Sequence, residues 1–141
     1  MDKKIMLRLV SLQSDGEDKS KVELFSEGLL RMTDAGYEIS YNETDATGFA
    51  GSTTKLTVVS DSKVTMERTG AASSTLILEK GKKHHCHYGT PYGDLMVGVT
   101  TSSIKSTITE NGGTLDFKYV LDINSSYVGD YEINLDVKAD S

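Results

Sequence analysis

The sequence predicts an all-β protein, in which residues 1–141 form one closed, antiparallel, up-and-down β-barrel of about eight to ten strands. Apolar and polar residues alternate along most of the chain, which is the pattern of β-strands. Short turn sequences separate the alternating segments at intervals of about 8–15 residues, as in successive hairpins. A single open sheet of this size would expose its edge strands, and closure removes those edges. A two-sheet sandwich is the second choice.

The alternation predicts which face of each strand meets the core. A strand points successive side chains to opposite faces, so a half-buried strand places every second residue inward. The segment YEISYNE is an example, because its tyrosines and isoleucine share one face and most of its polar residues share the other. The inward positions predicted in chain order are Tyr37, Ile39 and Tyr41; Val64 and Met66; Leu95, Val97 and Val99; Leu115, Phe117, Tyr119, Leu121 and Ile123; and Tyr131, Ile133, Leu135 and Val137.

The segment VELFSEGLLRM (22–32) is the strongest contender for a helix. Its Ser-Glu-Gly interior favours a strand with a bend instead. The predicted turns SDGEDKS, TDAG, DSK, EKGK, ENGG and SSYVGD each supply glycine, asparagine, aspartate or serine, which suit positive φ or side-chain turn bonds. No linker, repeat or charge run divides the chain, and we therefore expect a single domain.

The composition limits the classes of function. A net charge of −6 with only short basic clusters disfavours nucleic-acid binding, because phosphate-binding proteins carry a basic surface. Near the N-terminus, the apolar run before Arg8 is too short for a signal peptide or a membrane span. One cysteine excludes an internal disulfide and suits a reducing compartment. We expect a cytoplasmic protein with no nucleic-acid or membrane partner.

The segment GKKHHCHYGTPYGDL (81–95) concentrates the three histidines and the single cysteine. In a strand, His85 and His87 share one face, whereas His84 and Cys86 share the other. A zinc site needs three or four protein ligands, and no other His or Cys can complete one. The histidines next to Cys86 point away from its sulfur, which disfavours a nucleophile with a histidine base. We expect a solvated strand here, with no metal, no cofactor and no catalytic residue.

The end of the same segment, TPYGD, predicts a tight turn. Pro91 fixes φ, and Gly93 supplies the backbone freedom that such a turn requires. Tyr92 would then project from a loop at the mouth of the barrel, where its ring can cover the interior or stack on a ligand. The structural role and the ligand-binding role are compatible.

Strand parity gives the remaining candidates for a ligand-binding site. Glu43 continues the inward face of Tyr41, and Arg68 continues that of Met66. A buried charge must be paired or must serve a ligand. The two charges therefore form an internal ion pair that closes one end of the barrel, or Arg68 receives an anionic group such as a carboxylate or phosphate. A β-bulge would turn either side chain to solvent and remove both possibilities.

Tyr119 is the last candidate, because it lies in the middle of an inward apolar row. A buried tyrosine hydroxyl needs a hydrogen-bond partner. Thr101 or a ligand could supply that partner.

Five segments in this order resemble the YwiB-like family of small bacterial proteins, a domain of unknown function. They are SEG (26–28), YEISYNETDATGFAGSTTKL (37–56), MERTG (66–70), YGTPYGDL (88–95) and GGTLDFKYVLDI (112–123). The resemblance covers nearly the whole chain. It implies a closed barrel similar to those of the calycins and lipocalins, and a cytoplasmic location. It implies no activity.

Three hypotheses for function follow. The first is non-enzymatic binding of a small ligand, anionic or amphipathic, in or at the mouth of the barrel, with contacts from Glu43, Arg68, Tyr92 and Tyr119. The second is a protein-interaction module or homodimer with a fully packed barrel. The third is an enzyme that uses Glu43 as acid or base with Arg68 for charge stabilisation, which no sequence motif supports.

Overall fold

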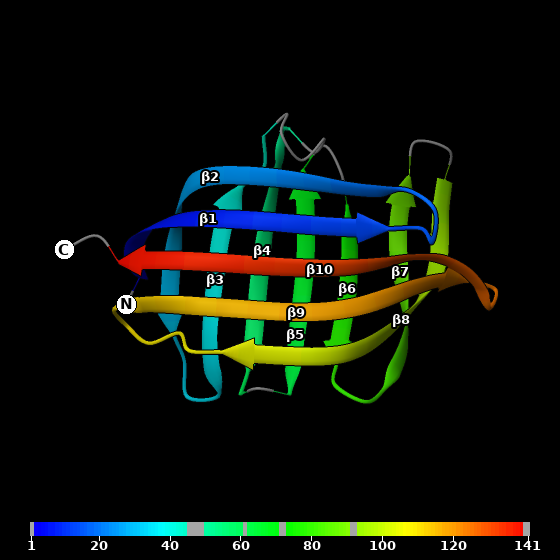
Figure 1. The fold of residues 1–141 in the computed structure, drawn as a ribbon. Helices are drawn as coiled ribbons and strands as arrows, with labels where there is room; N and C mark the ends of the chain where they lie inside the picture. Colours follow the sequence, from blue (N-terminus) through cyan, green and yellow to red (C-terminus); the bar gives the residue numbers. More distant parts are fainter. Residues whose placement is uncertain (1, 45–49, 61, 71–72, 91–92, 140–141) are drawn as a thin grey trace.

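Ten strands and no helix form the described part of the chain, residues 2–44, 50–60, 62–70, 73–90 and 93–139 of a computed structural model (Figure 1). No helix in these residues could therefore cross a membrane. The strands are β1 (Asp2–Ser14), β2 (Lys19–Met32), β3 (Gly36–Asn42), β4 (Ser52–Val59), β5 (Lys63–Gly70), β6 (Ser74–Glu79), β7 (Lys83–Thr90), β8 (Gly93–Ser106), β9 (Gly112–Ile123) and β10 (Ser126–Ala139). Each strand pairs with its neighbour in sequence, and β1 pairs with β10 to close the barrel. The predicted closed antiparallel barrel is confirmed.

The barrel is flattened into two layers that β2 and β8 join. In Figure 1, β1, β10 and β9 run across the front of β3 to β7, while β2 and β8 curve from one layer into the other. At Gly28, a Cβ atom would lie 2.6 Å from the carbonyl oxygen of Ser40 on β3, so only glycine allows this close approach. The register of β8 with β9 shifts between Thr101 and Ser103, which is a β-bulge. The strand with a bend that the sequence predicts for residues 22–32 is confirmed, because these residues lie in the curved strand β2.

Alternating side chains from all ten described strands fill the interior. The predicted inward rows are buried in the core or packed against it, because period-two alternation places one face of each strand inward. The exception is Leu95, which is 41% exposed. It pairs with Tyr88 near the end of the β7–β8 hairpin, and residues 93–96 at this end of β8 are all exposed.

The junction of β6 with β7 differs from the other strand junctions. Among the described residues, the two strands share one ladder pair, Ser74 with Tyr88. Further along, the N–H of Ile77 donates to the thiol sulfur of Cys86 at 3.2 Å, so a side chain takes the place of a backbone acceptor. The loop after β6 donates a backbone hydrogen bond to β8 instead. Side chains and a loop contact therefore close this junction.

Candidate functional site

A belt of mainly polar side chains lines one end of the barrel. The ladder pairs Tyr41 with Thr54, Thr54 with Arg68, Arg68 with Ser74, and Ser74 with Tyr88. These five residues, the polar belt, therefore stand directly opposite one another across β3 to β7. All five continue inward faces, and none of them is exposed. The polar belt is one ring of the interior, built from consecutive strand ends.

The layer below the polar belt is apolar. It contains Ile39, Leu56, Met66, Leu76 and Cys86, which lie two residues further into each strand and are buried. An apolar floor thus lies directly beneath the polar belt on β3 to β7.

Glu43 and Arg68 form an ion pair within this end of the barrel. Both Nε and Nη2 of Arg68 donate to Glu43 Oε2, at 3.3 and 3.2 Å. The hydroxyl of Thr54 donates to the same oxygen at 2.5 Å. The side chains of Arg68 and Glu43 are only 12% and 1% exposed. The predicted internal ion pair is present.

The backbone holds Glu43 in place after β3 has ended. Its N–H donates to the carbonyl oxygen of Ser52 at 2.9 Å, which continues the pairing of β3 with β4. The carboxylate therefore keeps the inward direction of Tyr41 instead of turning to solvent.

A cavity of about 120 Å³ opens between the ion pair and the facing layer of the barrel. Its polar lining includes Ser11 and Gln13 of β1 together with Arg68 and Glu43. Apolar side chains such as Leu56 and Phe117 form other parts of the wall. The cavity thus combines a guanidinium, a carboxylate and hydroxyl groups over an apolar base.

Four tyrosines, Tyr41, Tyr88, Tyr119 and Tyr131, also line this cavity. The rings of Tyr119 and Tyr131 stack with centroids 5.2 Å apart, and Tyr119 also stacks on Phe117 at 6.1 Å. Burial raises the pKa of the Tyr41 and Tyr119 hydroxyls far above the ordinary value, and burial also raises the pKa of Tyr131. These hydroxyls consequently remain protonated near neutral pH and keep their capacity to donate hydrogen bonds.

The structure brings three of the four candidate ligand-binding residues to this cavity: Glu43, Arg68 and Tyr119. The fourth, Tyr92, lies outside the described residues, although β7 and β8 are paired as far as Thr90 and Gly93 on either side of the predicted turn. Within the described chain, the hydroxyl of Thr101 has no hydrogen-bond partner. Of the two partners considered for the Tyr119 hydroxyl, Thr101 is therefore excluded, although the two residues are direct ladder partners. A ligand as that partner stays a prediction.

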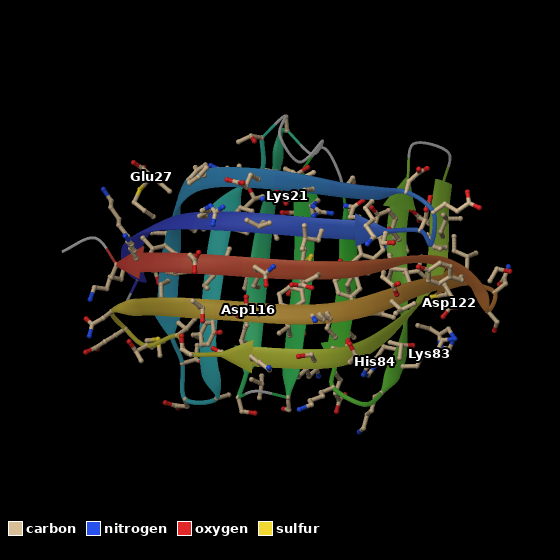
Figure 2. The ribbon with its side chains drawn as sticks, viewed as in Figure 1. Lys21, Glu27, Lys83, His84, Asp116 and Asp122 are labelled. Atoms are coloured by element: carbon tan, nitrogen blue, oxygen red, sulfur yellow. The ribbon has the colours of Figure 1, made fainter. Side chains whose placement is uncertain are left out.

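The histidines of β7 are distributed over separate contacts. His84 Nε2 lies 2.9 Å from Glu79 Oε1, and His87 Nε2 lies 3.0 Å from Asp94 Oδ2. Figure 2 shows His84 close to Lys83, which forms an ion pair with Asp122 at 2.9 Å. In the part of the chain that the structure describes, no three His, Cys, Asp or Glu side chains are grouped so that they could hold a metal ion.

The contact between His84 and Glu79 gives a prediction for pH. The hydrogen bond from His84, with a further one from Lys82, lowers the pKa of Glu79 below its ordinary value of 4.5. The stabilising contribution is therefore present above the unfolded pKa and is lost as the pH falls through the folded pKa. An NMR titration of the Glu79 carboxyl carbon should give a midpoint below 4.5, and His84→Ala should raise that midpoint. A midpoint unchanged by His84→Ala would show that this contact does not exist in solution.

Several residues of the site were not recognised from the sequence. Strand pairing alone brings Thr54, Ser74 and Tyr131 to the end of the barrel that holds the cavity. A signal was available in STTKLTVV and STLILE, where small polar residues at the start of a strand share the inward face with later aliphatic residues. This pattern predicts a polar mouth above an apolar core.

Comparisons with known proteins agree with the fold. The model of a domain of unknown function, DUF1934, matches residues 7–135. Among solved structures, the crystal structure of the ywiB protein from Bacillus subtilis is similar, with a TM-score of 0.86 at 19% identity, covering 99% of this chain and 94% of that chain. At this identity the likeness shows the fold alone, and it confirms the resemblance found in the sequence. No protein with a curated description matches the chain.

Proposed function

Since the chain belongs to the DUF1934 family, a domain of unknown function, we propose from its site alone that the protein binds a small anionic or amphipathic ligand at the polar mouth of the barrel, without catalysing a reaction. One observation carries the proposal. The lining of one cavity combines an arginine with its ion-pair partner, four tyrosines and several apolar side chains. Such a combination of convergent polar groups and an apolar wall is typical of small-molecule sites.

The size of the cavity limits what can enter it. Its volume is about 120 Å³, whereas an apolar cavity of about 150 Å³ holds one benzene molecule. The central layers of the barrel are filled with side chains such as Leu78, Leu115 and Phe117, which are fully buried. The cavity therefore admits a head group of a few atoms, and the rest of a larger ligand remains at the mouth. This use would differ from that of a lipocalin-like carrier that encloses its ligand.

Arg68 gives the site its preference for anions. A guanidinium has five N–H donors and matches a carboxylate or phosphate in geometry. Glu43 already neutralises this guanidinium, so an incoming anion competes with a neighbouring carboxylate. Removal of the Glu43 charge should consequently strengthen anion binding, and removal of both charges should abolish it.

The test uses the native protein and two variants. Native mass spectrometry of protein purified from its host should show a co-purified small molecule. Titration with phosphate, benzoate and decanoate, followed by NMR, should perturb the resonances of Tyr41, Tyr119 and Tyr131. Glu43→Gln should tighten binding of the probe that responds, by about tenfold if one unfavourable charge contact of about 1.4 kcal/mol is removed. Glu43→Gln/Arg68→Gln should show no response.

Two results would overturn the proposal. One is the absence of both a co-purified molecule and a response to any of the three probes. The other is binding that the Glu43→Gln/Arg68→Gln variant retains unchanged, which would place the ligand elsewhere. Thermal unfolding of each variant serves as the control for folding.

A further inference from the structure

The junction of β6 with β7 has the least backbone pairing in the part of the chain that the structure describes. The two strands share a single ladder pair there, Ser74 with Tyr88. The junction with the next fewest pairs, that of β2 with β3, has five. An antiparallel ladder supplies backbone hydrogen bonds along its whole length. Separation of β6 from β7 therefore breaks fewer of these bonds than separation at another described junction.

The contacts that stand in for the missing ladder are weak. The N–H of Ile77 donates to the sulfur of Cys86 at 3.2 Å, and a thiol sulfur is a poor acceptor. His84 Nε2 lies 2.9 Å from Glu79 Oε1, but both side chains are partly exposed. Contacts between charged groups that water can reach contribute little to stability. The junction is thus closed by interactions that cost little to break.

The strand on each side of the junction is held firmly by its other neighbour. β6 pairs with β5 along all six of its residues, and β7 pairs with β8 along all eight of its own. Lys83 Nζ also reaches across β8 to Asp122 Oδ2 of β9 at 2.9 Å, and Figure 2 labels both residues. Gly98 makes room for this contact, since a Cβ atom there would lie 2.6 Å from both side chains. Both strands can therefore stay in the sheet when they part from each other.

The turn that links the two strands is anchored elsewhere in the barrel. The N–H of Lys80 donates to the carbonyl oxygen of Ser62 at 3.0 Å. The N–H of Gly81 donates to the carbonyl oxygen of Thr101 on β8 at 3.1 Å. These bonds do not depend on the pairing of β6 with β7, so the turn can remain in place when the junction opens.

We infer that β6 separates from β7 while the rest of the barrel stays folded, and that this opening gives small molecules in solution access to the interior. Local opening of this kind uses the least stable contacts of a fold. Cys86 reports it directly, because its side chain points inward at the junction, is 4% exposed and is the single cysteine of the chain. The inference goes beyond the proposed ligand site and does not rest on it.

The reaction of the native protein with dithiodipyridine tests the opening. The Cys86 thiolate attacks the disulfide of the reagent, forms a mixed disulfide and releases a coloured thiopyridone. When closing is faster than labelling, the rate measures the population of the open form. Without urea, labelling should be about 100-fold or more faster than global unfolding alone allows. The rate should also depend weakly on low concentrations of urea, because a local opening exposes little surface.

Hydrogen exchange gives a second readout that needs no reagent. The N–H of Ile77 becomes free when its bond to Cys86 breaks. Its protection from exchange should therefore equal the protection of Cys86 from labelling. Amides at the centre of β1, which is paired on both sides, should exchange only through global unfolding.

Two matched variants link the opening to this junction. Glu79→Gln weakens the contact with His84 across the junction. Glu38→Gln weakens the contact with Lys55 across the junction of β3 with β4, and the two glutamate side chains are 26% and 24% exposed. Glu79→Gln should speed labelling of Cys86 by about two- to fivefold in the absence of urea. Glu38→Gln should leave that rate unchanged, and circular dichroism checks that both variants are folded.

Three outcomes would overturn the inference. The first is labelling of Cys86 at only the rate that global unfolding allows. The second is an equal effect of Glu79→Gln and Glu38→Gln. The third is a native Cys86 that reacts as fast as the unfolded thiol, which would mean that the junction does not close in solution. Each of them leaves the ligand proposal unaffected, since that proposal is judged by the binding of its probes at the mouth.

Discussion

Arg68→Leu is expected to destabilise the protein by about 3–5 kcal/mol, as for other buried ion pairs that lose one partner. The variant leaves the Glu43 carboxylate, whose side chain is 1% exposed, without its cation. Thr54 still donates one hydrogen bond to Oε2, but one neutral donor does not replace a guanidinium that donates twice. Urea denaturation followed by circular dichroism measures the loss in the free energy of unfolding.

Two further variants separate the ion pair from other effects at Arg68. Glu43→Leu/Arg68→Leu removes both charges and should recover most of the lost stability, since paired buried charges can be replaced by apolar residues at little cost. Lys55→Leu breaks a more exposed ion pair with Glu38 and should cost only about 0.2–1 kcal/mol. If Arg68→Leu costs no more than Lys55→Leu, the carboxylate of Glu43 is not held in a dry environment, and our description of this end of the barrel is wrong.

Tyr119→Ala is expected to destabilise the protein by about 3–5 kcal/mol, the range for removal of a buried aromatic side chain. Tyr119 is almost fully buried, and its ring lies between those of Phe117 and Tyr131. The substitution leaves a cavity and breaks both stacking contacts. Equilibrium urea unfolding measures the loss.

Tyr119→Phe is the control for the hydroxyl. It keeps the ring and both stacking contacts, so its stability should lie within about 1 kcal/mol of the wild type. Under the proposed function, the same variant should weaken binding of the probe ligand. A large loss of stability in Tyr119→Phe would show that the hydroxyl serves the fold, and it would remove Tyr119 from the ligand site.

Much of the fold could be predicted from the sequence because a half-buried strand has an unambiguous period. The alternation in TLDFKYVLDI and DYEINLDVKAD placed the inward rows of β9 and β10 correctly. The same argument placed Arg68 of β5 inside the barrel and, continued one residue past the end of β3, Glu43 as well. Leu95 shows the limit of the argument, since parity gives a face but does not say whether anything covers that face.

A polar mouth could have been predicted from the strand starts, but the pairing of residues within the polar belt could not, because it depends on register. Each strand contributes one residue, and only the pairing of Tyr41 with Thr54, Thr54 with Arg68, and Arg68 with Ser74 makes these residues neighbours. A shift of one residue would have sent a whole row to the other face. Register is set by turns and by packing across the barrel, and neither is visible in one strand alone.

Under the proposed function, the junction of β6 with β7 would couple ligand binding to closure of the barrel. Ser74 and Tyr88 form the ladder pair that the described parts of these two strands share, and both belong to the polar belt. Tyr88 thus belongs both to the cavity wall and to this ladder pair. A molecule bound in the cavity would stabilise the paired form of this junction, and opening of the junction would favour release of the molecule. By thermodynamic linkage, a ligand that binds only the closed form would lower the population in which this junction is open.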